Sequence, residues 1–133
     1  MRTTNIARRT VVVAALLSVL CCNNLHAEDE RSSVGPASPA AEYCVGLGYE
    51  SSVIQGDGGE SGQCRFLDGS TCDDWTFYRG QCGQANSYCE KHGGTISSMT
   101  EDMGGWTGIY AECTMPGGAK CKEETFWTTG SCP

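Results

Sequence analysis

Eight of the ten cysteines fall into two blocks of four, and the second block repeats the layout of the first. Steps of 20, 8 and 10 residues separate the first four, and steps of 24, 8 and 11 separate the second four. Neighbouring residues match as well, as with Tyr43 and Tyr88 just before the first cysteine of each block. The sequence therefore predicts one small cysteine framework that is used twice. The blocks are Cys44, Cys64, Cys72 and Cys82, followed by Cys89, Cys113, Cys121 and Cys132.

The first 27 residues have the order of a secretory signal peptide. A basic start precedes an apolar run over residues 11–20, and Ala27 offers a small residue for cleavage. The run is about half as long as a membrane-spanning helix, so we expect no permanent anchor. A lipid anchor on Cys21 or Cys22 is the alternative, although Leu20 stands where a lipoprotein signal places a small residue. We therefore expect soluble export, to the periplasm or the exterior.

Cleavage after Ala27 would leave a strongly acidic protein. Six basic and sixteen acidic residues would remain, which gives a net charge of −10. This charge opposes binding to nucleic acid and to anionic membrane surfaces. It keeps a secreted protein soluble, or it suits a basic partner.

The cysteines are expected to form structural disulfides. Their number is even, their spacing is regular and the chain is expected to be exported. Each repeat has only about 45 residues, a size at which a hydrophobic core alone rarely holds a fold. Two bridges in each repeat would restrict the unfolded chain and so stabilise the native state.

A hairpin argument bears on the pairing of these cysteines. If Asp68 and Gly69 form a two-residue turn, Arg65 faces Cys72, and Cys64 points to the opposite face of the sheet. A bridge between the two middle cysteines of a repeat is then disfavoured. We favour the pairs Cys44–Cys64, Cys72–Cys82, Cys89–Cys113 and Cys121–Cys132. Pairing of the first cysteine with the third and of the second with the fourth remains open.

Each repeat is predicted to be a small α+β unit, with a helix, a short antiparallel sheet or hairpin, and a short closing helix. A flexible leader over residues 28–38 is expected to precede repeat one at 39–82 and repeat two at 83–133. Ser38 is a good cap for the first helix of repeat one, and the equivalent helix of repeat two is predicted over residues 85–92.

The remaining elements follow from local composition. Short strands are predicted over residues 63–67 and 95–100, where residue types alternate. Gly-rich acidic turns are predicted over 55–60 and 101–105. Each repeat then closes with an acidic and aromatic stretch that ends in glycine, which is typical of a short helix. These closing helices are expected over residues 73–80 and 122–130.

Residues around the cysteines resemble a known family. The patterns Pro-Ala-x-x-Tyr-Cys, Cys-x-x-x-Asp-Gly-x-x-Cys, Asp-x-Trp-x-Phe-Tyr and Gly-x-Cys are similar to domain of unknown function family 333. The second copy matches less closely, with Glu124 in the place of Trp75. The resemblance implies a small exported bacterial domain, often labelled a hemolysin, and supplies no catalytic residues. The matching residues of the first copy are Pro39, Ala40, Tyr43, Cys44, Gly48, Cys64, Asp68, Gly69, Cys72, Asp74, Trp75, Phe77, Tyr78, Gly80 and Cys82.

No set of residues in the sequence predicts a reaction. His92 lies three residues after Cys89, but the first repeat has Leu47 at that place and the cysteine is expected to be oxidised. The closely spaced cysteine pairs of zinc sites are absent from the sequence. The acidic turns lack the alternating oxygen ligands of a calcium loop. We therefore expect no catalytic residue, no metal and no cofactor.

Two pairs of adjacent carboxylates, Asp73-Asp74 and Glu123-Glu124, are attributed to helix-start charge. Adjacent residues on a helix point about 100° apart, so such a pair would not face one substrate bond. The aromatic residues of the closing helices are expected in the core, in part with exposed rings that form a binding surface. The aromatic residues expected in the core are Trp75, Phe77, Tyr78, Phe126 and Trp127, and the candidates for the surface are Trp75, Tyr78 and Trp127.

Three functional classes follow from these observations. The first, which we favour, is an exported module that binds a protein or envelope partner. Inhibition of that partner is one form that this role can take. The second is a membrane-active lytic protein, which the charge and the lack of a long amphipathic helix oppose. The third is a small hydrolase, which the lack of a nucleophile–base pair opposes.

Overall fold

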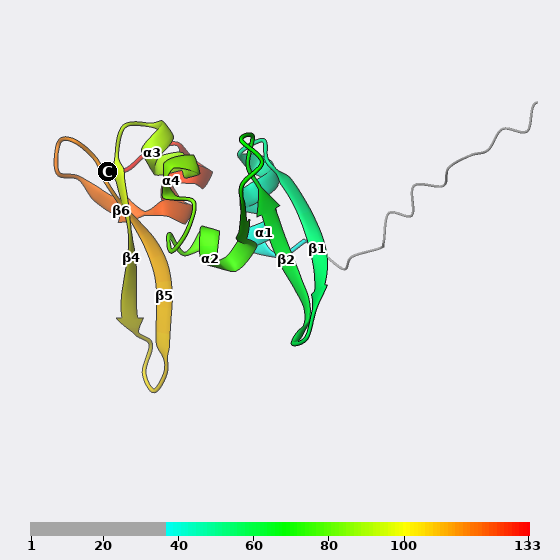
Figure 1. The fold of residues 1–133 in the computed structure, drawn as a ribbon. Helices are drawn as coiled ribbons and strands as arrows, with labels where there is room; N and C mark the ends of the chain where they lie inside the picture. Colours follow the sequence, from blue (N-terminus) through cyan, green and yellow to red (C-terminus); the bar gives the residue numbers. More distant parts are fainter. Residues whose placement is uncertain (1–36) are drawn as a thin grey trace, which may run out of the picture. The chain divides into compact units, whose positions relative to one another are not determined.

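The computed structural model describes residues 37–133, in which each repeat carries its own three-stranded antiparallel sheet (Figure 1). Helices flank each sheet in the chain, so the predicted pair of α+β repeats is confirmed. The first repeat consists of α1 (Pro39–Gly46), β1 (Glu50–Gly56), β2 (Gly59–Arg65), β3 (Thr71–Asp73) and α2 (Asp74–Tyr78). The second repeat consists of the 3-10 turn η1 (Gln84–Asn86), α3 (Tyr88–Lys91), β4 (Thr95–Asp102), β5 (Thr107–Thr114), β6 (Lys120–Lys122) and α4 (Glu123–Thr129).

The strands of each sheet pair in the order in which they occur along the chain. They are longer than the sequence predicts, because β1, β2 and β4 run into the segments assigned to acidic turns. Gly56 pairs with Gly59 across a tight turn, and Asp102 pairs with Thr107. The turns predicted over 55–60 and 101–105 are therefore present, but each predicted segment also includes strand residues. Backbone pairing with a partner strand overrides the weak strand preference of glycine and acidic residues.

Helix α1 begins where the sequence predicts. The Ser38 hydroxyl oxygen accepts a hydrogen bond from the backbone N–H of Ala41 at 3.1 Å, and Pro39 stands in the first turn. Gly48 follows the helix with a φ of 85°, a conformation that glycine adopts without strain. The helix thereby presents its buried side, with Tyr43 and Cys44, to the first sheet.

The helix predicted over residues 85–92 is interrupted in the structure. Ser87 has an extended conformation, with φ −69° and ψ 160°, which separates η1 from α3. Its hydroxyl oxygen accepts a hydrogen bond from the backbone N–H of Glu90 at 3.2 Å and caps α3. A serine that satisfies the first turn in this way starts a new helix, and so the prediction of one continuous helix was wrong.

The hairpins between β2 and β3 and between β5 and β6 have three-residue loops, whereas the sequence analysis assumed two. The Asp68 carboxylate accepts hydrogen bonds from the backbone and the hydroxyl of Ser70, and Gly69 has a φ of 84°. This wider loop shifts the register by one residue, so Cys64 lies opposite Cys72 and not on the other face. Cys64 and Cys72 therefore lie on the same face of the sheet, and the prediction that they point to opposite faces was wrong.

The middle cysteines nevertheless bond to other partners, and the disulfides are the pairs that the sequence analysis favoured. In each repeat one bridge ties the opening helix to the middle strand and lies fully in the core. The other ties the last strand to the segment after the closing helix and is half-buried. The four bridges are Cys44–Cys64, Cys72–Cys82, Cys89–Cys113 and Cys121–Cys132.

Each repeat has its own core around its inner disulfide. The first core is aromatic, with Tyr43, Tyr49, Phe66 and Phe77 in mutual edge or tilted contact. The second core is smaller and more aliphatic. It consists of Cys89, Ile96, Ala111, Cys113 and Phe126.

Within residues 37–133, no helix has the length and the apolar character that a bilayer crossing requires. The predicted signal peptide, most of the predicted leader and the alternative lipid-anchor cysteines Cys21 and Cys22 lie outside the described residues.

Removal of the inner disulfide is expected to cost more stability than removal of the outer one. Cys72→Ala/Cys82→Ala should lower the free energy of unfolding by about 3 kcal/mol through chain entropy. Cys44→Ala/Cys64→Ala opens a longer loop, 20 residues against 10, and also removes two fully buried sulfurs. Urea unfolding without reductant measures both losses. An equal loss, or a larger loss for the outer pair, would contradict this account.

Candidate functional site

A buried hydrogen bond joins the two repeats. Tyr43 of α1 donates its hydroxyl to Glu123 Oε1 of α4 at 2.5 Å, and the backbone N–H of Cys89 donates to the same oxygen at 3.0 Å. The Tyr43 hydroxyl oxygen in turn accepts a hydrogen bond from the backbone N–H of Tyr88 at 3.1 Å. Tyr43 and Glu123 are 0% and 1% exposed. The phenol therefore uses its donor and an acceptor position to connect repeat one to repeat two.

Aromatic packing surrounds this joint. The Trp127 ring meets Tyr43 edge-on, with 5.4 Å between the ring centroids. Gly46 allows this approach, because an added Cβ would lie 2.6 Å from the Trp127 ring. Burial and the negative charge of Glu123 raise the pKa of the Tyr43 hydroxyl well above its usual value. The joint thus pairs a neutral phenol with a carboxylate, and both side chains are buried.

Asp74 holds in the first repeat the place that Glu123 holds in the second. Each is the second residue after the third cysteine of its repeat and the first residue of the closing helix. Asp74 is 3% exposed, and its Oδ1 atom has no hydrogen-bond partner among the described residues. Burial, with a contribution from the nearby charge of Asp73, raises the pKa of the Asp74 carboxyl.

The Asp74 carboxylate lies over Gly62 of β2, where an added Cβ would overlap it. The equivalent residue of the second repeat is Ala111, which has the same offset from the second cysteine of its repeat. In the first repeat the shorter carboxylate, Asp74, is thus combined with the smaller strand residue, Gly62. In the second repeat the longer Glu123 is combined with Ala111, and its side chain reaches the joint instead.

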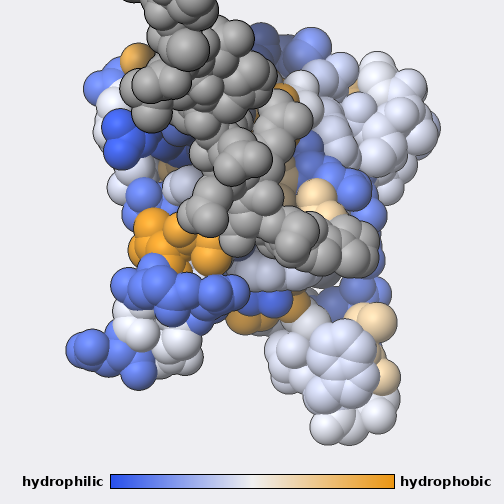
Figure 2. Space-filling view, turned by 90° about the vertical axis from the view of Figure 1, so that its right-hand side faces the viewer, coloured by the Kyte–Doolittle hydropathy of each residue, from blue (hydrophilic) through white to orange (hydrophobic). Residues whose placement is uncertain are grey.

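Asp74 lines a cavity of about 1030 Å³ on the first repeat, which we call the Asp74 pocket. Helix α1, strands β1 and β2 and the start of α2 form its walls. Figure 2 views the side of the molecule that carries β1 and shows orange hydrophobic atoms next to blue hydrophilic ones. The lining residues are Ala37, Ser38, Ala41, Glu42, Val45, Gly46, Ser51, Ser52, Val53, Glu60, Ser61, Gly62, Asp73, Asp74 and Trp75.

The same face of the second repeat is covered by the first repeat. Ile96 faces Cys113 as Ser51 faces Cys64, so Ile96 and Ser51 are equivalent. Gly80 lies against this face, where an added Cβ would be 3.2 Å from Ala111 Cβ and 3.4 Å from Ile96 Cγ1. Tyr43 covers Glu123. The described residues thus fill this face in repeat two and leave it open in repeat one.

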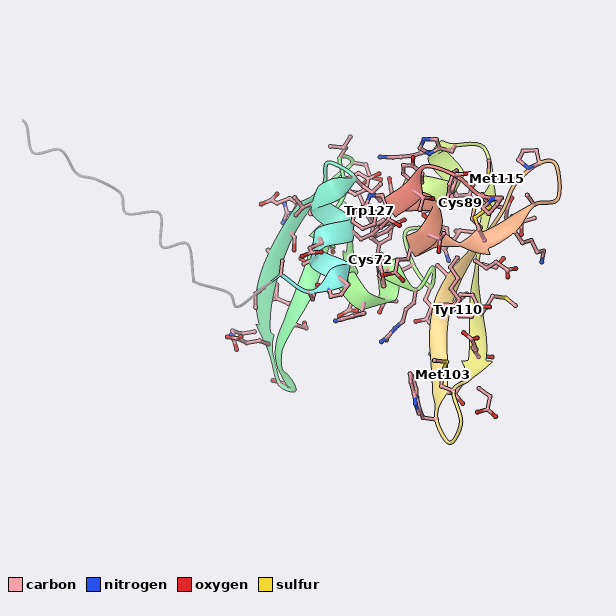
Figure 3. All side chains as sticks on the ribbon, turned by 180° about the vertical axis from the view of Figure 1, so that it is seen from behind. Cys72, Cys89, Met103, Tyr110, Met115 and Trp127 are labelled. Carbon is pink, nitrogen blue, oxygen red and sulfur yellow. A yellow bond between two sulfur atoms is a disulfide. The ribbon has the colours of Figure 1, made fainter. Side chains whose placement is uncertain are left out.

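The structure separates the three aromatic residues that the sequence analysis named as a binding surface. Trp75 is 38% exposed and lines the Asp74 pocket, and its ring meets Tyr78 edge-on at 5.8 Å. Trp127 instead packs in the joint, where Figure 3 labels it on α4. Trp75 and Tyr78 also line a second cavity of about 400 Å³. Its other lining residues are Arg79, Trp106, Thr107, Gly108 and Ile109.

The residues considered for catalysis or metal binding have structural contacts. His92 is exposed at the end of α3, and its Nδ1 atom lies 2.7 Å from the Tyr88 carbonyl oxygen. Cys89, Cys113 and Glu123 bring their ligand atoms within 4.8 Å of one another. The two sulfurs are bonded to each other, however, and so offer no thiolate to a metal.

Sequence reasoning missed the burial of Asp74 and Glu123. Asp73 fits the predicted helix-start role, since its carboxylate accepts from the backbone N–H of Thr76 at 2.9 Å. The residues at the first helical position are instead enclosed. The available signal was that both repeats keep a carboxylate two residues after the third cysteine.

Loss of the phenol at the joint should destabilise the protein more than loss of another buried phenol. Tyr43→Phe leaves the Glu123 carboxylate without this donor and should lower the free energy of unfolding by about 1–3 kcal/mol. Tyr49→Phe is the matched control, because the Tyr49 hydroxyl donates to the neutral Asn86 carbonyl oxygen at 2.9 Å. It should cost about 1 kcal/mol. Urea unfolding measures both, and a smaller loss for Tyr43→Phe would argue against the joint.

Stability should fall at alkaline pH. Burial beside Glu123 raises the pKa of Tyr43, and burial beside Glu124 raises the pKa of Tyr78 to about 12, above the ordinary 10.0. The folded state holds these protons more tightly, so the stabilisation is complete below about pH 10 and declines above it. The Tyr78 part is lost as the pH rises through about 12, and the Tyr43 part continues to decline beyond that. Tyr43→Phe should flatten this decline. Urea midpoints measured against pH test it, and an equally steep decline in the variant would refute the assignment to Tyr43.

Comparison with known proteins agrees with the repeated framework. A family model described as Domain of unknown function (DUF333) matches residues 35–81 and again residues 84–129. The chain is 36% identical over 56 residues to an uncharacterized protein of Archaeoglobus fulgidus, a match that covers 42% of this chain and 26% of that protein. No solved structure matches the chain. Because the two family matches lie in tandem and together span more than half of the sequence, the chain belongs to the DUF333 family, with one copy of the domain in each repeat.

Proposed function

We propose that the chain is an exported, disulfide-stabilised binding module without catalytic activity, and that it recognises its partner with the Asp74 pocket. The observation that carries this proposal is the Asp74 side chain. A buried carboxylate oxygen without a hydrogen-bond partner is unfavourable unless a ligand supplies the donor. The Asp74 residue lies in the wall of a cavity, although its Oδ1 atom is itself enclosed.

The disulfides support a role outside the cytoplasm. All eight cysteines between residues 44 and 132 are paired, and such bridges persist in oxidising compartments. They also hold the walls of the pocket in place. Cys44–Cys64 ties α1 to β2, and both elements line the pocket. Pre-formed walls lower the conformational entropy lost on binding.

The contacts of the titratable groups favour binding over hydrolysis. Paired cysteines are not nucleophiles, and the His92 ring packs at a tilt against the Tyr88 ring, with 3.9 Å between the centroids. The Asp74 pocket contains carboxylates and four serines in its walls. Within the described part of the chain, no histidine or lysine that could activate a serine lines it.

A displayed library of random peptides tests the proposed site. Peptides selected on the folded wild-type chain should lose at least about tenfold in affinity for Val53→Trp, because Val53 lies opposite Gly62 and its side chain faces the pocket. Ser97→Trp is the control, since Ser97 is exposed on the equivalent strand β4 of the second repeat. It should leave binding unchanged. Equal effects of the two substitutions, or no selectable peptide, would reject the Asp74 pocket as the recognition site.

Membrane lysis is the second candidate, and one observation favours it. Met103 and Trp106, in the loop between β4 and β5, are 48% and 61% exposed, and Figure 3 labels Met103 in this loop. Exposed apolar side chains at a hairpin end suit the interface of a bilayer. Glu101 and Asp102 lie beside them and oppose contact with anionic lipid.

A leakage assay decides between these functions. The chain at micromolar concentration is expected to release no dye from vesicles of mixed zwitterionic and anionic lipids. Dye release that Trp106→Ser abolishes would establish the lytic function and displace the binding proposal.

A further inference from the structure

We infer that the Asp74 pocket takes a lysine or arginine side chain, presented by an extended segment of another protein. This inference rests on the proposed function and adds the chemical class of the ligand. It follows from the charge of the pocket walls, from the apolar side chains between the carboxylates, from the geometry of Asp74 and from the position of β1 at the edge of its sheet.

The charge of the pocket is uniform. Four carboxylates line it, and no lysine, arginine or histidine among residues 37–133 does. One of the four, Glu60, also accepts a hydrogen bond from the Gln55 side chain at 2.6 Å. A cation that enters is attracted by all four charges, and an anion is repelled. The carboxylates are Glu42, Glu60, Asp73 and Asp74.

The walls between these carboxylates are apolar. Val45 and Val53 are 58% and 45% exposed, and Trp75 and Ala41 also line the pocket. Lysine and arginine side chains have aliphatic stems that pack on such surfaces while the charged end reaches a carboxylate. A small inorganic cation would leave these walls in water. The combination therefore selects a cation on a long apolar stem.

The two repeats explain why the ligand differs from the tyrosine of the joint. In repeat two, the Glu123 oxygen receives a neutral phenol and a backbone N–H. In repeat one, Asp74 is one carbon shorter and lies over Gly62. No described residue donates to its Oδ1 atom, and the same is true of Glu123 Oε2 in repeat two. A guanidinium offers five N–H donors and an ammonium offers three, which suits a carboxylate with an unused acceptor.

The size and place of the pocket indicate a peptide segment and not a free amino acid. A cavity of about 1030 Å³ is at the upper end of the range for small-molecule pockets. Strand β1 lies at the edge of its sheet and pairs only with β2 among the described strands. Its residues Ser51, Ser52 and Val53 line the pocket. An extended segment beside this edge can place one side chain in the cavity.

The experiment uses the peptides selected on the folded chain. The selected sequences should share a lysine or arginine, and its replacement by norleucine should weaken binding by at least about tenfold. Asp74→Asn should weaken the original peptide to a similar extent and the norleucine peptide much less. Asp68→Asn, which removes the same charge from an exposed hairpin remote from the pocket, should change binding less than about twofold.

Gly62→Ala gives a second variant that keeps every charge. Its methyl group should displace the Asp74 carboxylate and weaken the cationic peptide, while the norleucine peptide keeps its affinity. Circular dichroism and thiol titration check that both variants are folded and fully oxidised. If Asp74→Asn does not fold, Gly62→Ala still provides the test.

The outcomes separate this inference from the proposed function. Peptides that Val53→Trp excludes but that carry no shared cation would overturn the inference and leave the binding function standing. If no selected peptide responds to Val53→Trp, both fall. If Asp74→Asn converts a self-associated protein to a monomer in light scattering, the occupant is a second copy of this chain, and the inference is overturned.

Discussion

The hydrogen bond from Tyr43 to Glu123 determines how the two repeats differ. It is buried, it crosses the boundary between the repeats and it fixes the hydroxyl that receives the Tyr88 N–H. A duplicated framework offers the same face twice, and this bond together with Gly80 covers that face in repeat two. Repeat one covers the face of repeat two, but no described residue of repeat two covers the equivalent face of repeat one. The open face is a consequence of duplication without symmetry.

The divergence of matched residues follows this difference. Ala111 and Glu123 serve a closed interior, whereas Gly62 and Asp74 line an open cavity. Each repeat keeps its two disulfides, its left-handed glycines and a buried phenylalanine in the closing helix. The shared residues therefore maintain the scaffold, and the differences lie where one repeat meets another surface.

Much of this scaffold could be predicted from the sequence. The cysteine steps gave the duplication, Ser38 and Gly48 marked α1, and the acidic-aromatic stretches located the closing helices. The hairpin register could not be derived, because it depends on how Asp68 bonds to Ser70. The Asp74 pocket could not be derived either, since its walls come from three segments and depend on whether a carboxylate is buried. Asp73 and Asp74 are adjacent and chemically identical, yet Asp73 is exposed and caps a helix, whereas Asp74 is buried.

Carbon-13 NMR of the side-chain carboxyl groups tests the central claim most directly, with the amide of arginine as the titrant. The account predicts that the Asp74 carboxyl resonance shifts progressively with the added cation, because the pocket is open to it. The Glu123 resonance should stay unchanged, because Tyr43 already occupies that face. Equal responses of Asp74 and Glu123, or no response of Asp74 at saturating titrant, would contradict the account.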